Sequence, residues 1–368
     1  MNESTLHNEN ELVASEEQEH DIKVAEEASP EETEATTPDI VEPLQTDDRH
    51  IPTIPQLCVA LAILLMVFSA PYVSAFMHHT KLTAQANTQP SVSTPQAALL
   101  YKTGIFDTIE IKAESAYVWD VALQRALFNK NAHVQLPLAS LTKLMTALVA
   151  YETTGTDATV AISSSAIHQE GESGFKKGEV WKAKDLLDFT LMTSSNDGAY
   201  ALAGSAGAAL LSDNLTPEAS FVRAMNKKAE EIGLTQTYFT NPTGLDASQS
   251  QSGSYGSARD MAFLMEYVVR HKPELLEKTK RSAAVFSDTE GTRFAATNTN
   301  QEISSLDNPI GSKTGYTVLA GGNLVIAFNI GLDHPIIVSV LGSSREGRFS
   351  DVQKLIEGVK ESYIPISP

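Results

Sequence analysis

The pattern of apolar and polar positions divides the chain into a polar N-terminal stretch, one long apolar run and a region of mixed strand and helix patterns. In the mixed region, two short segments predict strands joined by a turn, at 115–120 and 125–129. Apolar positions that recur every three or four residues then predict four helices, over 137–151, 183–193, 197–210 and 217–232.

The C-terminal third of the chain returns to strand patterns, at 310–317, 322–330 and 335–341, and closes with an amphipathic helical pattern over 352–363. The order is therefore strands, several helices, strands and a helix. This order predicts an α+β fold in which both ends of the domain build one antiparallel sheet and a helical insert separates them.

The charge of the chain is concentrated at its N-terminus. The net charge is −19, and residues 1–50 hold 16 acidic and two basic residues, a net of −14, which leaves −5 for the rest. We predict that residues 1–50 form a disordered acidic tail. The remainder is close to neutral, so nothing in it indicates a nucleic-acid partner.

The apolar run predicts a membrane segment. No Asp, Glu, Lys or Arg occurs between Arg49 and Lys81, and the core at 57–77 has the ~20 residues that a helix needs to cross a bilayer. We predict a signal anchor at 51–80 and a linker at 81–106, with the N-terminus cytoplasmic and the domain at 107–368 extracytoplasmic. The alternative is secretion after cleavage near Ala75, where small residues fit a cleavage site.

Cysteine and histidine usage excludes several kinds of chemistry. Cys58 is the only cysteine and lies in the apolar run, which rules out disulfides and thiol catalysis within the chain. The nine histidines show no zinc-peptidase spacing, so we expect no metal and no cofactor.

Three motifs occur in the order S-x-x-K, S-x-N and K-T-G, which is typical of serine enzymes that react with penicillin or D-alanyl peptides. They begin at Ser140, Ser194 and Lys313. Ser140 and Lys143 lie three residues apart on a predicted helix, so the lysine can take the proton of the serine. A free lysine titrates near ~10.4, so burial and a second cation, here Lys313, must lower the pKa of Lys143.

The other two motifs supply the remaining candidates. Ser194 would relay a proton, and Asn196 would bind the lysine and a substrate carbonyl. Lys313 and Thr314 could bind a terminal carboxylate, while the glycine that follows them lets substrate backbone approach. The predicted oxyanion hole is formed by the backbone N–H groups of Ser140 and Tyr316.

Each motif also has a competing copy, at Ser173 (S-x-x-K), Ser212 (S-D-N) and Lys102 (K-T-G). The first lies in a glycine-flanked polar segment, and the second precedes the Thr216-Pro217 helix start. The third precedes the nucleophile and lies at the end of the predicted linker. We interpret all three as accidental, because a nucleophile needs a rigidly held base.

Longer strings around the preferred motifs resemble the D-alanyl-D-alanine carboxypeptidase family, the low-molecular-mass penicillin-binding proteins. They lie at 139–147, 193–199, 225–229, 233–235, 241–245, 258–260, 313–317 and 320–324. The resemblance covers about 107–365 and implies a serine β-lactamase/DD-peptidase-like fold, with Arg348 near the bound carboxylate. Many family members carry a trailing β-rich module; because only 53 residues follow Gly315, we expect the N-terminal segment to replace the C-terminal anchor.

The resulting prediction is a membrane-tethered serine D-Ala-D-Ala carboxypeptidase that trims peptidoglycan stem peptides through a Ser140 acyl-enzyme. Its predicted catalytic residues are Ser140, Lys143 and Ser194, and its predicted substrate-binding residues are Asn196, Lys313, Thr314, Gly315, Tyr316 and Arg348. β-Lactams are the expected inhibitors. A DD-endopeptidase that cuts cross-links is the first alternative, followed by a β-lactamase, which lacks the E-x-x-L-N string, and an inactive wall-binding protein. The oligomeric state is left open.

Overall fold

The computed structural model describes residues 99–211 and 214–365. The predicted acidic tail and membrane segment lie outside these residues, as does most of the predicted linker. Among the helices that are described, none is long and apolar enough to cross a membrane.

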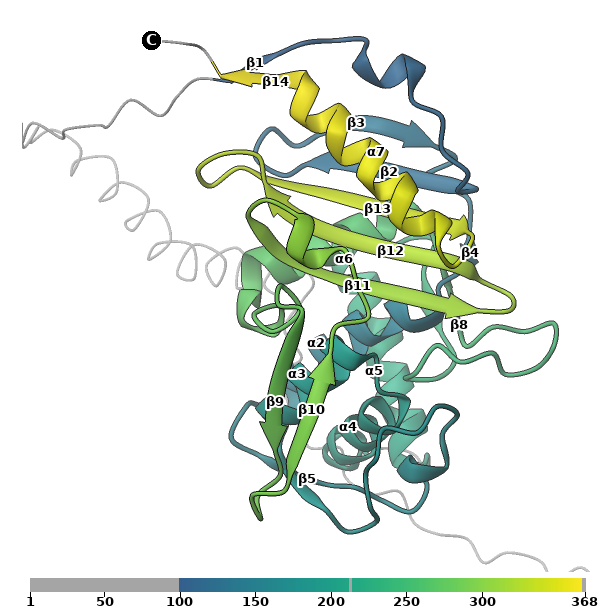
Figure 1. The fold of residues 1–368 in the computed structure, drawn as a ribbon. Coiled ribbons are helices and arrows are strands. Elements are labelled where there is room, and N and C mark those ends of the chain that lie inside the picture. The colour runs from purple at the N-terminus through teal and green to yellow at the C-terminus, as the bar shows by residue number, and fades with distance from the viewer. Residues whose placement is uncertain (1–98, 212–213, 366–368) are drawn as a thin grey trace, which may run out of the picture. The chain divides into compact units, whose positions relative to one another are not determined.

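The central sheet takes its strands from both ends of the described chain. They are β2 (Ser115–Asp120), β3 (Arg125–Lys130), β11 (Pro309–Thr317), β12 (Gly321–Asn329) and β13 (Pro335–Ser343). The sheet is antiparallel in the order β11-β12-β13-β2-β3, as Figure 1 shows. Strand β13 pairs with β2, with Ser339 opposite Tyr117, which joins the late strands to the early ones. This confirms the predicted α+β sheet.

One helix covers each face of the sheet (Figure 1). Because side chains alternate along a strand, Val338 and Val340 of β13 share a core with Leu355 of α7 (Gly347–Ser362). Ile337, which precedes Val338 and belongs to the opposite face, packs in a second core with Leu264 of α6 (Ala258–His271). The second core continues into the helical insert, so the sheet and the insert are held together by one apolar interior.

The helical insert contains α2 (Thr142–Thr154), α3 (Ala183–Thr193), α4 (Asn196–Ala209) and α5 (Pro217–Ile232). The last three follow the predicted bounds closely. The first does not, because Leu136–Pro137 forms strand β4 and pairs with β8 (Ser254–Gly256). The chain then passes through a short 3-10 helix, η2 (Ala139–Leu141), before α2 begins.

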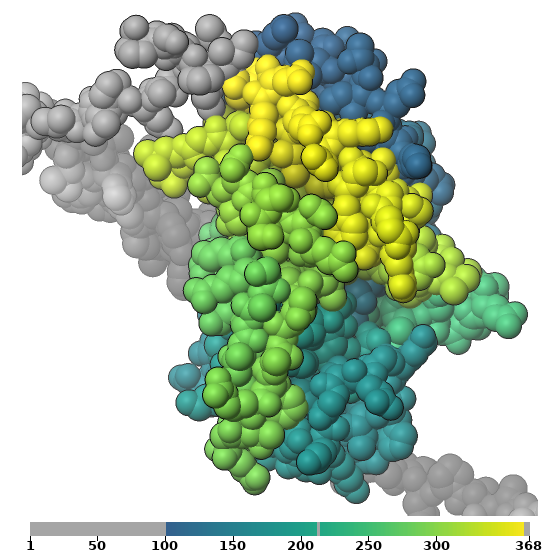
Figure 2. All heavy atoms as spheres, viewed as in Figure 1, coloured from purple at the N-terminus to yellow at the C-terminus, as the bar shows by residue number. Residues whose placement is uncertain are grey.

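The shorter elements complete the domain. They are η1 (Ile105–Thr108), β5 (Thr159–Ala161), η3 (Ala166–His168), β6 (Val180–Lys182), β7 (Tyr238–Phe239), η4 (Pro273–Leu275), β9 (Ala283–Ser287), β10 (Arg293–Thr297) and η5 (Ile303–Ser305). Hairpin β9–β10 runs away from the sheet alongside α3, and Figure 2 shows it in green beside the teal helical part. Its Phe294 packs against Phe175, Trp181 and Phe189, which fixes the hairpin to the insert.

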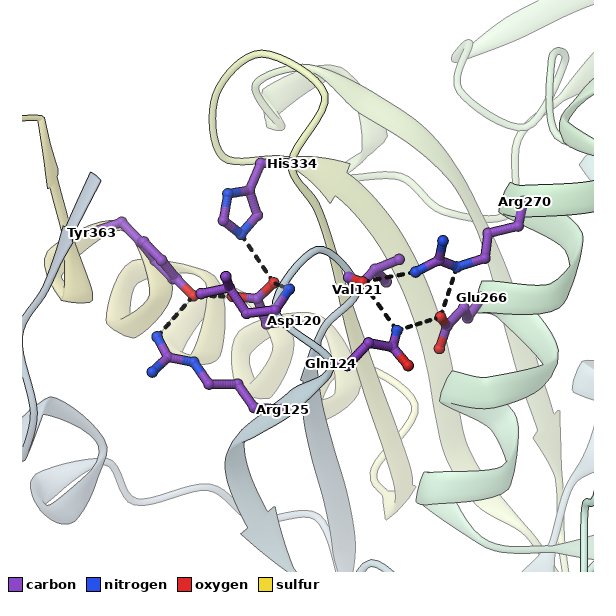
Figure 3. Close-up of polar contacts among 9 residues, drawn as sticks. Asp120, Val121, Gln124, Arg125, Glu266, Arg270, His334 and Tyr363 are labelled. Carbon is purple, nitrogen blue, oxygen red and sulfur yellow. Dashed lines mark hydrogen bonds and ion pairs between the residues drawn. The ribbon is translucent and has the colours of Figure 1, made fainter. Parts of the chain in front are cut away.

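The two ends of the described chain pair with each other. Strand β1 (Leu99–Tyr101) lies within the predicted linker and pairs with β14 (Tyr363–Pro365), so the folded part begins earlier than residue 107. At this point the buried Asp120 carboxylate accepts hydrogen bonds from Tyr363 Oη and from Leu123 N–H, and it contacts His334 Nε2 at 2.9 Å, as Figure 3 shows in part. Asp120 therefore ties the last strand to β2 and to the β12–β13 hairpin.

Candidate active site

Ser140 lies in a tight turn between β4 and α2. Ala139, within the turn, has a φ of 50°, a left-handed conformation that residues with a Cβ rarely adopt. Two glycines from other segments contact the turn: a Cβ on Gly315 would lie 2.9 Å from Leu138 O, and one on Gly244 would overlap Ala139 O. The strained turn is thus clamped from two sides, which fixes the position of the Ser140 side chain.

Lys143 follows Ser140 by three residues, and its side chain is fully buried. Its Nζ lies 2.9 Å from Ser140 Oγ, 2.6 Å from Asn196 Oδ1 and 2.7 Å from the carbonyl oxygen of Thr243. Burial keeps water away from the ammonium form and lowers the pKa of Lys143 from 10.5 to about 7. The structure therefore brings the predicted nucleophile and base within hydrogen-bond distance.

The three contacts of Lys143 suit the neutral amine as well as the ammonium ion. An ammonium group has three N–H donors, one for each oxygen. After the loss of one proton, two N–H groups remain for Asn196 and Thr243, whose oxygens are acceptors in these contacts. The lone pair is then left facing Ser140 Oγ, in the direction required to accept its proton.

Ser194 and Asn196 lie at the junction of α3 and α4. Ser194 ends α3 with a φ of 62°, and Ser195 caps α4 by accepting a hydrogen bond from the N–H of Gly198. The sharp turn places Ser194 Oγ 2.8 Å from Lys313 Nζ and points Asn196 toward Lys143. The second motif is thus joined to both of the others.

Lys313 is also buried, in strand β11, and donates hydrogen bonds to Ser194 Oγ and to the carbonyl oxygen of Thr314. Burial lowers the pKa of Lys313 well below its usual value, and repulsion from Lys143 and Arg348 adds to this effect. We predicted that Lys313 would lower the pKa of Lys143. Burial lowers the pKa of Lys143, and because the repulsion between the two buried lysines is mutual, it opposes both amines being charged at the same time.

A cleft of about 760 Å³ opens onto Ser140 and Ser194, and its walls include Thr299, Thr314, Gly315, Tyr316 and Arg348. Arg348 donates from Nη1 to the carbonyl oxygen of Gly315 at 2.6 Å, and Thr314 Oγ1 lies 2.7 Å from Thr299 Oγ1. Four of the predicted substrate-binding residues therefore line the cleft. The other two, Asn196 and Lys313, contact Lys143 and Ser194 instead.

In the described part of the chain, no group of three or more His, Cys, Asp or Glu side chains is arranged to hold a metal ion. The reacting groups that this site presents are two serine hydroxyls and two buried amines.

Comparison with known protein families identifies the family of this chain. The family model for D-alanyl-D-alanine carboxypeptidase matches residues 102–345, about two thirds of the sequence. The chain belongs to this family. It is 30% identical, over 68% of its length, to D-alanyl-D-alanine carboxypeptidase DacF of Bacillus subtilis, of which it spans 63%. It is 27% identical, over 73% of its length, to a D-alanyl-D-alanine endopeptidase of Pseudomonas aeruginosa, of which it spans 83%.

Solved structures give the same assignment. A penicillin-binding protein of Listeria monocytogenes, crystallised in its ampicillin-bound form, is 28% identical to the chain with a TM-score of 0.56. The match covers 68% of this chain and 98% of the Listeria protein. The predicted serine β-lactamase/DD-peptidase-like fold is thereby confirmed.

The competing motif copies have different surroundings from the active-site motifs. Ser173 contacts Ser195, its Oγ 2.6 Å from Ser195 Oγ, while Lys176 is exposed. The copy at Lys102 is exposed and follows β1, where the Lys102 N–H bonds to the carbonyl oxygen of Ser362. The first two residues of the copy at Ser212 lie outside the described residues.

Two residues that contribute to the site were not among the predicted ones. Thr243 supplies a backbone carbonyl oxygen to Lys143, and Thr299 bonds to Thr314 in the cleft wall. Thr243 belongs to the family-like string at 241–245, which was the one signal that marked its neighbourhood. A backbone acceptor carries no side-chain signature, so its role is visible only in three dimensions.

Gly315 also has a role that we did not predict. We predicted that its missing side chain makes room for substrate. The structure shows that it makes room for the Ser140 turn, because an added Cβ would lie 2.9 Å from Leu138 O, 3.2 Å from Ser140 N and 3.3 Å from Ala139 Cβ. Two of these neighbours are backbone atoms, which cannot move aside by changing a rotamer.

We predict that Gly315→Ala pushes the Ser140 turn away from β11 and lowers the free energy of unfolding by about 1–3 kcal/mol, the usual effect of overpacking. Denaturant unfolding of the variant measures this change. Gly204→Ala in α4 is the matched control, because its Cβ would meet only Glu218 Oε1, at 3.5 Å, and alanine favours a helix. If the two variants were equally stable, the close contact between Gly315 and the Ser140 turn would not be important for folding.

Proposed function

We propose that the protein is a serine-type D-Ala-D-Ala carboxypeptidase that removes the terminal D-alanine from peptidoglycan stem peptides. The observation that carries the proposal is the fully buried Lys143 amine, 2.9 Å from Ser140 Oγ and with a pKa of about 7. A lysine with this pKa is neutral often enough at physiological pH to act as a general base. Membership of the carboxypeptidase family supports the same activity.

Acylation follows from the contacts in the site. Lys143 takes the Ser140 proton while Ser140 Oγ forms a bond to the carbonyl carbon between the two D-alanines. The backbone N–H groups of Ser140 and Tyr316, on the two segments that Gly315 lets approach, stabilise the oxyanion. When the C–N bond breaks, the leaving amine takes a proton from Ser194 Oγ, which regains one from Lys313 Nζ, 2.8 Å away. The proton that Lys143 took from Ser140 replaces the one that Lys313 gave up, and Lys143 is neutral again. The carboxylate of the departing D-alanine would lie beside Thr314 and Arg348 in the cleft.

Deacylation uses the same groups in reverse. Lys143 accepts a proton from a water molecule, whose oxygen forms a bond to the ester carbonyl carbon. The C–O bond to Ser140 breaks, and the serine recovers its proton from Lys143. β-Lactams would acylate Ser140 in the same way, and the ampicillin-bound form of the similar Listeria protein supports them as inhibitors.

A DD-endopeptidase is the second candidate, because the similar Pseudomonas protein carries that name and the chain spans 83% of it. Both reactions break a D-alanyl peptide bond and need the same serine and lysine. They differ in the group that leaves: a free D-alanine in one and the side-chain amine of a second stem peptide in the other.

The deciding experiment uses the full chain purified in detergent, with Ser140→Ala as the control. It is incubated with an uncross-linked pentapeptide and with cross-linked muropeptide dimers, and the products are followed by mass. We expect the loss of one D-alanine from the pentapeptide with the unmodified chain alone. Cleavage of the dimer alone would make the protein an endopeptidase. No product from either, and no ampicillin adduct on Ser140, would support a wall-binding protein without activity.

We expect acylation to depend on pH through Lys143. Burial lowers the pKa of Lys143 to about 7, so the amine is protonated and inactive as a base below that pH and neutral above it. The rate of acylation by a fluorescent penicillin should fall about tenfold per pH unit below ~6 and level off above ~8. Lys143→Arg should lose this reaction at all pH values, since its guanidinium stays charged. A rate independent of pH from 5 to 9 would exclude Lys143 as the base.

We propose for the rest of the chain that residues 51–80 anchor the protein, with 1–50 in the cytoplasm and the catalytic domain outside the membrane. The uncharged run of the sequence and the extracytoplasmic position of peptidoglycan support this topology. Protease added to intact cells should leave an N-terminal epitope tag uncut and degrade the domain. A cut tag, or a mature protein that begins near residue 76, would overturn the anchor.

A further inference from the structure

A loop next to the site bonds to three consecutive residues at the start of α4. We call residues 170–173, between η3 and β6, the covering loop. Its Glu170 carbonyl oxygen accepts a hydrogen bond from Asn196 Nδ2 at 2.6 Å. The Ser173 N–H donates to Asp197 Oδ2 at 3.1 Å, and Ser173 Oγ lies 2.6 Å from Ser195 Oγ. The loop is therefore attached to the same short segment that supplies Asn196 to the active site.

The contact with Glu170 sets the orientation of the Asn196 amide. Because Nδ2 is the donor to Glu170, Oδ1 is the atom that faces Lys143, at 2.6 Å. An amide turned by 180° would present N–H groups to Lys143, and no N–H of the neutral lysine would have an acceptor there. The lone pair of Lys143 could then accept a hydrogen bond from Asn196 and would no longer point toward Ser140 Oγ.

Asp197 is the group that holds the covering loop in place. Its side chain is 3% exposed, and Oδ1 has no hydrogen-bond partner among the described residues. Burial raises the pKa of Asp197, and the nearby Glu172 adds to this, so the carboxylate is kept here at a cost in free energy. A neutral residue would avoid that cost, which indicates a role other than stability.

We propose that Asp197 is a positioning residue that fixes the covering loop so that Glu170 orients the Asn196 amide and Asn196 in turn orients Lys143 toward Ser140. The inference rests on the proposed function for its kinetic consequence. It also explains the second S-x-x-K motif, because Ser173 binds Asp197 and Ser195 and does no chemistry of its own.

The test compares variants of the full chain in detergent. Asp197→Ala removes the acceptor for the Ser173 N–H, whereas Asp197→Asn retains an oxygen that can accept it. Asp185→Asn is the matched control, since Asp185 lies in the first turn of α3, a helix whose end leads into the site. Ser173→Ala removes the hydroxyl that contacts Ser195 and Asp197 but keeps the Ser173 N–H that donates to Asp197, and Ser164→Ala, at an exposed serine, is its control.

The first measurement is the rate of acylation by ampicillin as a function of pH. At pH 7, Asp197→Ala should be about ten- to hundredfold slower than the unmodified chain, the usual effect of a displaced catalytic group. Its profile should also move to higher pH, because water that enters beside a displaced Asn196 solvates the Lys143 ammonium, which reverses the burial that lowers the pKa of Lys143. Asp197→Asn should recover most of the rate, and Ser173→Ala should shift the profile less, in the same direction.

The second measurement follows the titration of Lys143 directly, by NMR of ¹³C-labelled lysine with Lys143→Arg to assign the signal. The midpoint should be higher in Asp197→Ala and Ser173→Ala than in the two control variants. Identical midpoints in variants and controls would overturn the inference, whether or not ampicillin reacts. If the unmodified chain is never acylated, the proposed function fails and the lysine titration alone decides the inference. If Asp197→Ala does not fold, Ser173→Ala decides it.

Discussion

The fully buried amine of Lys143 depends on three oxygen acceptors that come from three separate segments. A charged amine without water or acceptors would cost several kcal/mol or more, so the pKa falls until the neutral form is accessible. Asn196 and Thr243 must therefore be placed accurately before Ser140 can react. The Ser140 turn, the turn between α3 and α4 and the loop at 241–245 meet at the Lys143 amine nitrogen, and much of the local structure serves to hold these three segments in place.

The sheet supplies the opposite wall of the site. Strand β11 passes so close to the Ser140 turn that Gly315 has no room for a side chain, and its Lys313 reaches across to Ser194. Helix α7 braces the same strand, because Arg348 donates to the carbonyl oxygen of Gly315. Strand β11 pairs along its length with β12, on which helices α6 and α7 pack, and this support gives the fixed edge that an oxyanion hole made of backbone N–H groups requires.

The parts of the fold that could be predicted from the sequence are those with a strong local pattern. The helices at α3 and α5 follow their predicted bounds because apolar spacing and, for α5, the Thr216 cap act locally. Helix α6, strands β4 and β8 and the β9–β10 hairpin were not predicted; Leu136–Pro137, for example, becomes a strand only through its pairing with β8. The carbonyl of Thr243 and the left-handed conformation of Ala139 are set by tertiary contacts in the same way.

The two S-x-x-K copies show why spacing alone does not define such a site. Both place a serine and a lysine three residues apart, and both lie close to the first turn of α4. Lys176 is exposed, so water solvates its ammonium group and nothing drives it to release a proton. Lys143 has the same covalent structure, but it lies where water is excluded and where Asn196 and Thr243 offer acceptors for two of its three N–H bonds. The reactivity of the motif therefore depends on its buried environment, and residues far from the motif in sequence form that environment.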